Sequence, residues 1–86
     1  MISSAQMRAA RALLGIDQRR LAELSGLSAP TIQRMEGSDG VVRAVVDSLD
    51  KVVNALSAAG VEFIAPSEPS RGTGRGVRFI ERTPPA

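Results

Sequence analysis

Residues 18–36 read QRRLAELSGLSAPTIQRME, a pattern that predicts two short helices joined by a tight turn. The first helix is predicted over residues 18–25, with Asp17 as its N-cap and Gly26 as its stop. The second is predicted to follow the N-cap Ser28 and to run to about Glu36. Pro30 is tolerated in it because first-turn N–H groups have no intrahelical partner.

Two helices that cross this closely need a small residue at the contact, a turn residue that tolerates positive φ, and a compact apolar wedge. Ala22 and Gly26 meet the first two needs. The wedge residues are Leu21, Leu27, Ile32 and Met35. Leu24 is predicted to point inward as well.

Two further helices are predicted on either side of this stretch. Residues 4–14 are good helix formers, with Ser3 or Ser4 as N-cap and Gly15 as the stop. Beyond the loop 37–40, apolar residues recur at helical spacing and predict an amphipathic helix of about 15 residues that stops at Gly60. Its predicted core positions are Val45, Val46, Leu49, Val52, Val53 and Leu56.

After Gly60 the pattern becomes alternating, and residues 60–64 (GVEFI) are echoed by residues 76–80 (GVRFI). Both copies predict strands, and an antiparallel hairpin would place Glu62 opposite Arg78. Residues 66–75, rich in Pro, Ser, Gly and Arg, predict a mobile loop, with Arg71 and Arg75 offering a less favoured minor-groove or phosphate-contacting arm. The hairpin is expected to pack against a partner chain.

The composition bounds the class of protein. With 86 residues the chain has room for one small domain, and 43% hydrophobic residues predict a modest core. The sequence contains no His and no Cys, which removes the commonest general base, metal ligand and strong nucleophile. We therefore expect a binding protein and not an enzyme, with no catalytic residues, metal or cofactor. The absence of a signal peptide and of a long apolar run predicts a cytoplasmic protein without a membrane partner.

Ten of the eleven basic residues are Arg, whose planar guanidinium suits phosphates and guanine edges. The formal net charge is only +2, but residues 1–36 and 61–86 are basic and residues 37–60 are slightly acidic. This distribution hints at nucleic acid as the partner.

The order of these segments resembles the phage-repressor and Cro-like helix-turn-helix family, also called XRE-like regulators. The resemblance covers residues 7–60: a first helix ending in Leu-Leu-Gly, the Gln-x-x-Leu-Ala-x-x-Ser-Gly unit, a Thr-Ile-x-Arg-x-Glu recognition helix, and a closing amphipathic helix. It implies a mainly α, four- to five-helix lambda-repressor-like domain over residues 1–60. Residues 61–86 then form a C-terminal β-hairpin or arm and a candidate dimerisation element.

The resemblance also implies a DNA-binding surface on double-stranded DNA. Gln18 and the N–H groups at its helix start would clamp a phosphate, and the residues that open the recognition helix would face the major groove. Arg34 is the best candidate for reading a base, since Arg to guanine is the commonest specific contact. The complete predicted set is Gln18, Ser28, Ala29, Pro30, Thr31, Gln33, Arg34 and Arg43.

Several residues of the motif have structural interpretations instead. Glu36 would pair with Arg11, as the resemblance implies for this position. Ser28 and Asp17 would serve as caps, and Arg19 and Arg20 would form a solvated face. Ala29 and Pro30 depart from the polar residues of family members, and the loop 38–40 lacks the basic residues that relatives carry.

Sparse base and phosphate contacts imply weak binding by one copy. A homodimer would place two recognition helices about 34 Å apart on a near-palindromic operator. The sequence therefore predicts a homodimeric, sequence-specific transcriptional regulator. Two alternatives stay open: the antitoxin of a toxin-antitoxin pair that represses its own operon, with residues after Gly60 binding the toxin, or a protein-interaction module that has lost DNA binding.

Overall fold

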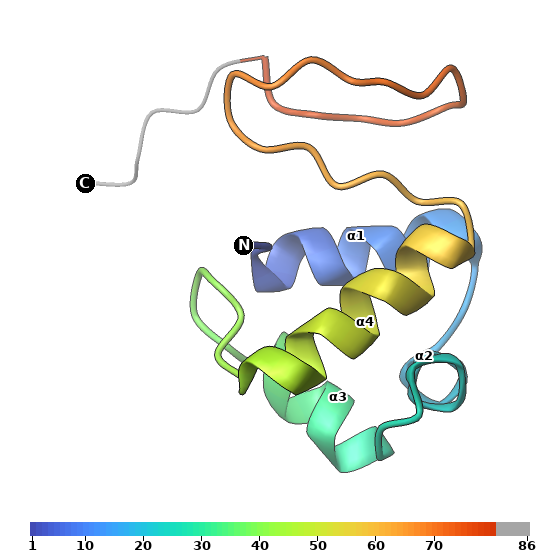
Figure 1. Cartoon of the computed structure of the whole chain (residues 1–86), viewed down its shortest axis with the longest axis vertical. Helices are drawn as coiled ribbons and strands as arrows, with labels where there is room; N and C mark the ends of the chain where they lie inside the picture. The colour runs from blue at the N-terminus through green and yellow to red at the C-terminus, as the bar shows by residue number, and fades with distance from the viewer. Residues whose placement is uncertain (81–86) are drawn as a thin grey trace.

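Four helices form within residues 1–80, the part of the chain that the computed structural model describes (Figure 1): α1 (Ser4–Leu14), α2 (Gln18–Ser25), α3 (Ala29–Glu36) and α4 (Val46–Ala58). The predicted mainly α fold is confirmed at this level. The first three helices have the predicted bounds, and α4, with 13 residues, is slightly shorter than predicted.

Side-chain caps and glycines fix the helix ends as the sequence predicts. Ser3, Asp17 and Ser28 each accept a hydrogen bond from the backbone N–H three residues further on, at 3.0, 2.8 and 3.2 Å. Gly15 and Gly26 follow α1 and α2 in the left-handed conformation, with φ of 68° and 73°. Only glycine adopts this conformation without a steric penalty, so these two positions end their helices.

The core lies where α1, α2, α3 and α4 meet. The largest side chains that are completely buried are Met7, Leu21, Ile32, Met35, Val52 and Leu56. Ala10 and Ala22 are buried beside them, and Leu27 packs against the cluster from the turn between α2 and α3. The predicted wedge is therefore present.

Three predicted core residues are exposed instead. Leu24 is 41% exposed because the buried positions of α2 are Leu21, Ala22 and Ser25, and at about 100° per residue Leu24 lies outside that stripe. Val45 and Val46 are 71% and 74% exposed. They form the N-cap and the first residue of α4, ahead of the part of the helix that packs on the core.

The chain start is fastened to the loop between α3 and α4. Ser4 donates its backbone N–H to the Gly40 carbonyl at 2.8 Å, and the Val42 N–H donates to the Ile2 carbonyl at 3.0 Å. The Ser4 hydroxyl also donates to the Ser38 carbonyl at 2.7 Å. Ile2 and Val42 are buried in the core as a result. This pairing holds the loop that follows α3 against α1.

The C-terminal arm, residues 61–80, is irregular, and the predicted hairpin is not formed within the described residues. Figure 1 shows the arm leaving α4, turning back and turning again, so that residues 61–65 and 76–80 run in the same direction. Antiparallel strands run in opposite directions, so this course of the arm leaves the two segments without the predicted pairing. Residues 81–86 of the predicted arm lie outside the described residues.

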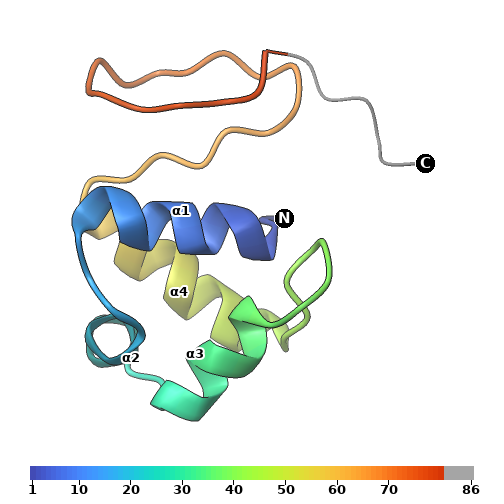
Figure 2. The same ribbon diagram turned by 180° about the vertical axis from the view of Figure 1, so that it is seen from behind.

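The arm and α3 lie at opposite ends of the molecule, as both Figure 1 and Figure 2 show. Val61 and Phe63 anchor the start of the arm by packing against the core. The side-chain amide of Gln6 in α1 adds a 3.3 Å hydrogen bond to the Ile64 carbonyl. The surface around α3 is thus free of the arm.

Candidate nucleic-acid interface

The surface of α3 divides into a core face and a solvent face. Ile32, Met35 and Glu36 are buried. The solvent face carries Ala29, Pro30, Gln33 and Arg34, all exposed. Positions three and four apart are neighbours on a helix, so these four residues form one continuous surface.

Gln33 and Arg34 are the polar members of this surface. Among residues 1–80 neither side chain has a hydrogen bond or an ion pair. An exposed guanidinium and an exposed amide offer several donors and one acceptor to an outside molecule. The structure thus brings these two predicted site residues together on one accessible face.

Ser28 and Thr31 lie at the start of the same helix, and their hydroxyls are 2.8 Å apart. The Ser28 hydroxyl oxygen also accepts the Thr31 N–H, so the pair forms the N-terminal cap of α3. One hydroxyl hydrogen is used between the two residues, which leaves the other for an outside acceptor. Both predicted roles, capping and presentation to a ligand, are compatible with this geometry.

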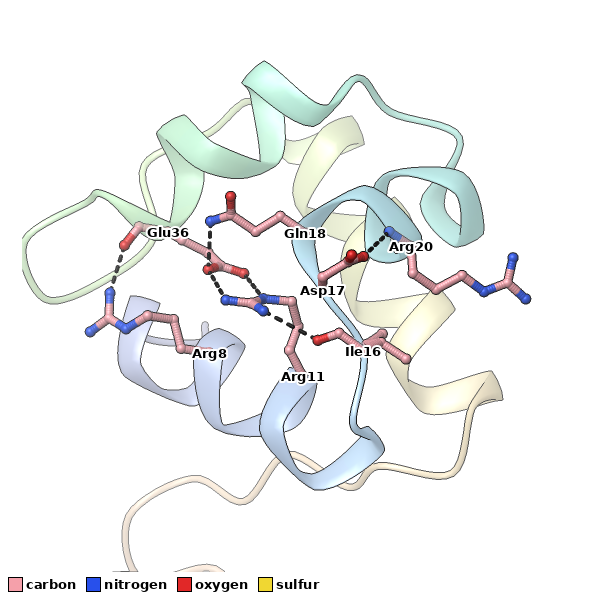
Figure 3. A network of polar contacts seen from close by, with 7 residues as sticks. All are labelled: Arg8, Arg11, Ile16, Asp17, Gln18, Arg20 and Glu36. Carbon is pink, nitrogen blue, oxygen red and sulfur yellow. Dashed lines mark hydrogen bonds and ion pairs between the residues drawn. The ribbon is translucent and has the colours of Figure 1, made fainter.

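The orientation of α3 is set by a polar network around Glu36, drawn in Figure 3. The Arg11 guanidinium of α1 donates to both carboxylate oxygens, at 2.5 and 2.7 Å. Gln18 of α2 donates to the same carboxylate at 3.0 Å. The Arg8 guanidinium donates to the Glu36 backbone carbonyl at 2.7 Å, at the end of α3. Three helices are joined at this one residue.

The network keeps the buried carboxylate charged. Burial by itself raises the pKa of Glu36, but the hydrogen bonds from Arg11 and Gln18 and the charges of Arg11 and Arg8 outweigh it, so the pKa lies below its ordinary value. The hydrogen bond between Arg11 and Glu36 also raises the pKa of Arg11. The Arg11–Glu36 pair implied by the resemblance is confirmed, and it neutralises the acidic residue at the end of α3.

Gln18 also serves the fold, and its predicted phosphate contact stays a prediction. The side chain is half-buried and its amide N–H is bound to Glu36 (Figure 3). The Asp17 carboxylate caps the start of α2 beside it. An amide nitrogen carries two hydrogens, so one remains for an outside acceptor. The main contribution of Gln18 in this structure is to join α2 to α3.

Arg43 lies in the loop between α3 and α4, with an exposed side chain. Its backbone N–H donates to the Ser38 hydroxyl at 3.0 Å, which fixes the backbone of the loop. Within residues 1–80 its guanidinium has no partner. The exposed carboxylate of Asp39 shares the loop, so the local charge is mixed.

Sequence reasoning missed two contributors to this region. Arg8 was not assigned a role, although its position one helical turn before Arg11 indicates that both reach the same neighbour. The pairing of Ile2 with Val42, which fixes the loop that carries Arg43, has no local sequence signal because 40 positions separate the two residues.

Residues 1–80 contain no group of three or more His, Cys, Asp or Glu side chains that could hold a metal ion. None of the helices in residues 1–80 has the length and apolar character needed to cross a lipid bilayer.

Comparison with known proteins adds no relative. No protein-family description, no curated protein and no solved structure matches the chain.

Proposed function

We propose that this protein is a sequence-specific DNA-binding transcriptional regulator of the phage-repressor and Cro-like type. In this proposal α2, the turn at Gly26 and α3 form the helix-turn-helix, and α3 enters the major groove of an operator. Two copies act together as a homodimer on a near-palindromic site.

The observation that carries the proposal is the contrast between the two sides of α3. On the inner side, Glu36 is tied to α1 and α2 by three side chains, which fixes the angle of the helix. On the outer side, Gln33 and Arg34 are exposed and have no partner among residues 1–80. A rigid helix with polar side chains unused by the fold is suited to reading base edges.

The chemistry of the outer face defines what each residue would do. Arg34 would donate to O6 and N7 of a guanine, and Gln33 would bond an adenine or a phosphate. Ala29 and Pro30 offer apolar contact, such as with a thymine methyl group.

The phosphate contacts would come from the residues around the two helix starts and from the loop after α3. Ser28 and Thr31 have a spare hydroxyl hydrogen and would bind a backbone phosphate. Arg43 and the N–H groups at the start of α2 would bind phosphates as well.

The proposal is tested by selection from a random duplex DNA library with wild type and Arg34→Ala. Wild type should enrich a two-fold symmetric sequence, and Arg34→Ala should lose preference at one base position per half-site, with affinity reduced about 5- to 150-fold. Lys51→Ala, at an exposed position of α4 that belongs to no predicted DNA contact, removes the same charge and should keep the preference.

The salt concentration makes the test decisive. Phosphate contacts are strongest at low salt, so a DNA-binding protein must bind some duplex there. Absence of any enrichment at low salt, by a folded wild-type chain, would refute the proposal and favour the protein-interaction module instead.

The antitoxin alternative has one structural observation in its favour. The arm and α3 lie at opposite ends of the molecule, so a protein on the arm and DNA on α3 would not compete for the same surface. Co-expression with the product of a toxin-sized neighbouring gene tests it. A ternary complex of both proteins and operator DNA supports the antitoxin, and no binding of that product excludes it.

A further inference from the structure

A cavity of about 310 Å³ lies between the end of α1 and two parts of the C-terminal arm. One part lies within residues 60–64, at the start of the arm, and the other within residues 70–78. Figure 1 shows the arm leaving α4 and later turning back on the same side of the molecule. A volume of this size is at the lower end of the range for small-molecule sites, so the cavity has room for a small organic molecule.

The charged groups that line the cavity favour an anion. Two guanidinium groups, of Arg75 and Arg78, against the one carboxylate of Glu62 leave the lining with a net charge of +1. The Glu62 carboxylate is already bound within the arm, because it accepts from the Ser70 hydroxyl at 2.7 Å and from the N–H groups of residues 71 and 72 at 2.7 and 3.2 Å. The guanidinium groups therefore decide which charge the cavity attracts.

The donors of the cavity differ in how far the fold uses them. The Arg78 guanidinium donates to the carbonyls of Glu68 and Ala65, at 2.6 and 3.4 Å. In the described part of the chain, the Arg75 guanidinium has no hydrogen bond or ion pair, and the backbone N–H groups of Gly74, Arg75 and Gly76 donate to no protein group. A guanidinium beside unused backbone N–H groups is a donor set that binds carboxylate or phosphate oxygens.

The cavity also has apolar walls. Leu13, near the end of α1, lines it and is 53% exposed, and Val77 lines it from the arm and is 88% exposed. Val61 and Ile64 contribute further apolar surface. A ligand with an apolar group would remove part of this surface from water, which favours binding.

We propose that this cavity binds a small organic anion, a carboxylate or a phosphate monoester that carries an apolar group about the size of a phenyl ring. Arg75 and the N–H groups of residues 74–76 bind the anionic group, and Leu13 and Val77 cover the apolar group. Because the ligand contacts α1 and the arm together, it holds the arm against the helical domain.

The proposal goes beyond DNA binding and does not depend on it. The arm and α3 lie at opposite ends of the molecule, so a ligand in the cavity and DNA on α3 would not compete for one surface. A chain that selects no DNA could still bind the anion, and a chain that binds no anion could still select DNA.

The test titrates the full-length chain with phenylacetate and with phenyl phosphate. Calorimetry gives the affinity, and amide NMR spectra locate the site. Both anions should bind saturably, one per chain, with shifts centred on the amides of Leu13, Gly74 and Gly76. The tighter of the two identifies the anionic group. Neutral phenylacetamide and inorganic phosphate each lack one half of the contacts and should bind about tenfold more weakly or less.

Two variants with matched controls test the residues. Arg75→Ala should weaken binding of the tighter anion about tenfold or more, because it removes the charge-assisted hydrogen bonds. Arg19→Ala, at an exposed position of α2 outside the cavity, removes the same charge and should bind like wild type. Leu13→Asp places a carboxylate in the cavity and should abolish binding, whereas Leu24→Asp, at an exposed position of α2, should not. Circular dichroism checks that each variant keeps its helices.

Four results would overturn the proposal. The first is the absence of saturable binding of either anion by the folded wild-type chain at millimolar concentration. The second is phenylacetamide that binds as tightly as phenylacetate, and the third is a set of amide shifts that leaves out the residues around the cavity. The fourth is an equal loss of affinity in Arg75→Ala and Arg19→Ala, which would show attraction of the anion to the overall charge and not to this site.

Discussion

Arg11 of α1 and Glu36 of α3 face each other in a bidentate ion pair, with bonds of 2.5 and 2.7 Å, although 25 positions separate them in the chain. The Glu36 side chain is only 3% exposed and that of Arg11 is 19% exposed. Pairs in this geometry are stronger than exposed ion pairs and fix the relative angle of the elements they join. The pair therefore links the stability of the domain to the orientation of its proposed recognition helix.

Replacement of Arg11 by methionine should destabilise the domain by about 3 kcal/mol, because a buried carboxylate is left without its cation. Unfolding in urea, followed by helical circular dichroism, measures the change. Lys51→Met is the control, since it breaks the exposed Lys51–Asp47 pair within α4 and should change stability by no more than about 0.5 kcal/mol. Equal losses in both variants would contradict the role given to the Arg11–Glu36 pair.

Acid should destabilise the domain through Glu36. Its folded-state pKa lies below the ordinary value of 4.5, so the folded state binds fewer protons than the unfolded state. The contribution of Glu36 is fully present above pH 4.5 and is lost as the pH falls through the lower folded-state pKa.

The comparison with Glu36→Gln isolates this residue. The pKa of Glu62 is also lowered, chiefly by the Ser70 hydroxyl, so some acid sensitivity will remain in the variant. Glu36→Gln should be less stable than wild type at pH 7, and the difference should shrink below pH 4.5. A difference that stays constant from pH 7 to pH 3 would show that the carboxylate charge does not contribute.

The helices could be predicted because their signals are local. Ser3, Asp17 and Ser28 each bond an N–H only three residues away, and Gly15 and Gly26 each stop a helix through their own φ angle. The apolar wedge between α2 and α3 could be predicted for the same reason, because all of its residues lie within residues 18–36. The Arg11–Glu36 pair, which no local pattern indicates, became predictable only through resemblance to a family.

Features that depend on distant parts of the chain could not be predicted in this way. The burial of Val42 depends on its pairing with Ile2, and the exposure of Val45 and Val46 depends on where the other helices stop covering α4. The hydrogen bond from the Gln18 amide to Glu36 depends on how α3 folds back, and no local pattern indicates it. The arm alternates like a hairpin, yet residues 61–65 and 76–80 run in the same direction and do not form that pair.

Gly26→Ala should destabilise the domain by roughly 1 to 2 kcal/mol, although a Cβ there would meet no atom within 4 Å. The cost arises from its φ of +73°, which an L-residue adopts only with strain. Gly74→Ala is the matched control, because its Cβ would also meet open space and its φ is not left-handed. Urea unfolding should find that control within about 0.5 kcal/mol of wild type. If Gly26→Ala is equally neutral, the turn between α2 and α3 does not require glycine.

Arg43→Ala should weaken DNA binding to nearly the same extent on every sequence, because a phosphate contact carries no base information. The exposed guanidinium sits on a loop held by Ser38 and by the pairing of that loop with the chain start. Loss of one phosphate contact should reduce the slope of log affinity against log salt by about 1. Titrations of operator and unrelated duplex at several salt concentrations measure both quantities, with Lys51→Ala in α4 as the control for the lost charge. A loss confined to the operator would instead assign Arg43 to base readout, and an unchanged slope would remove it from the interface.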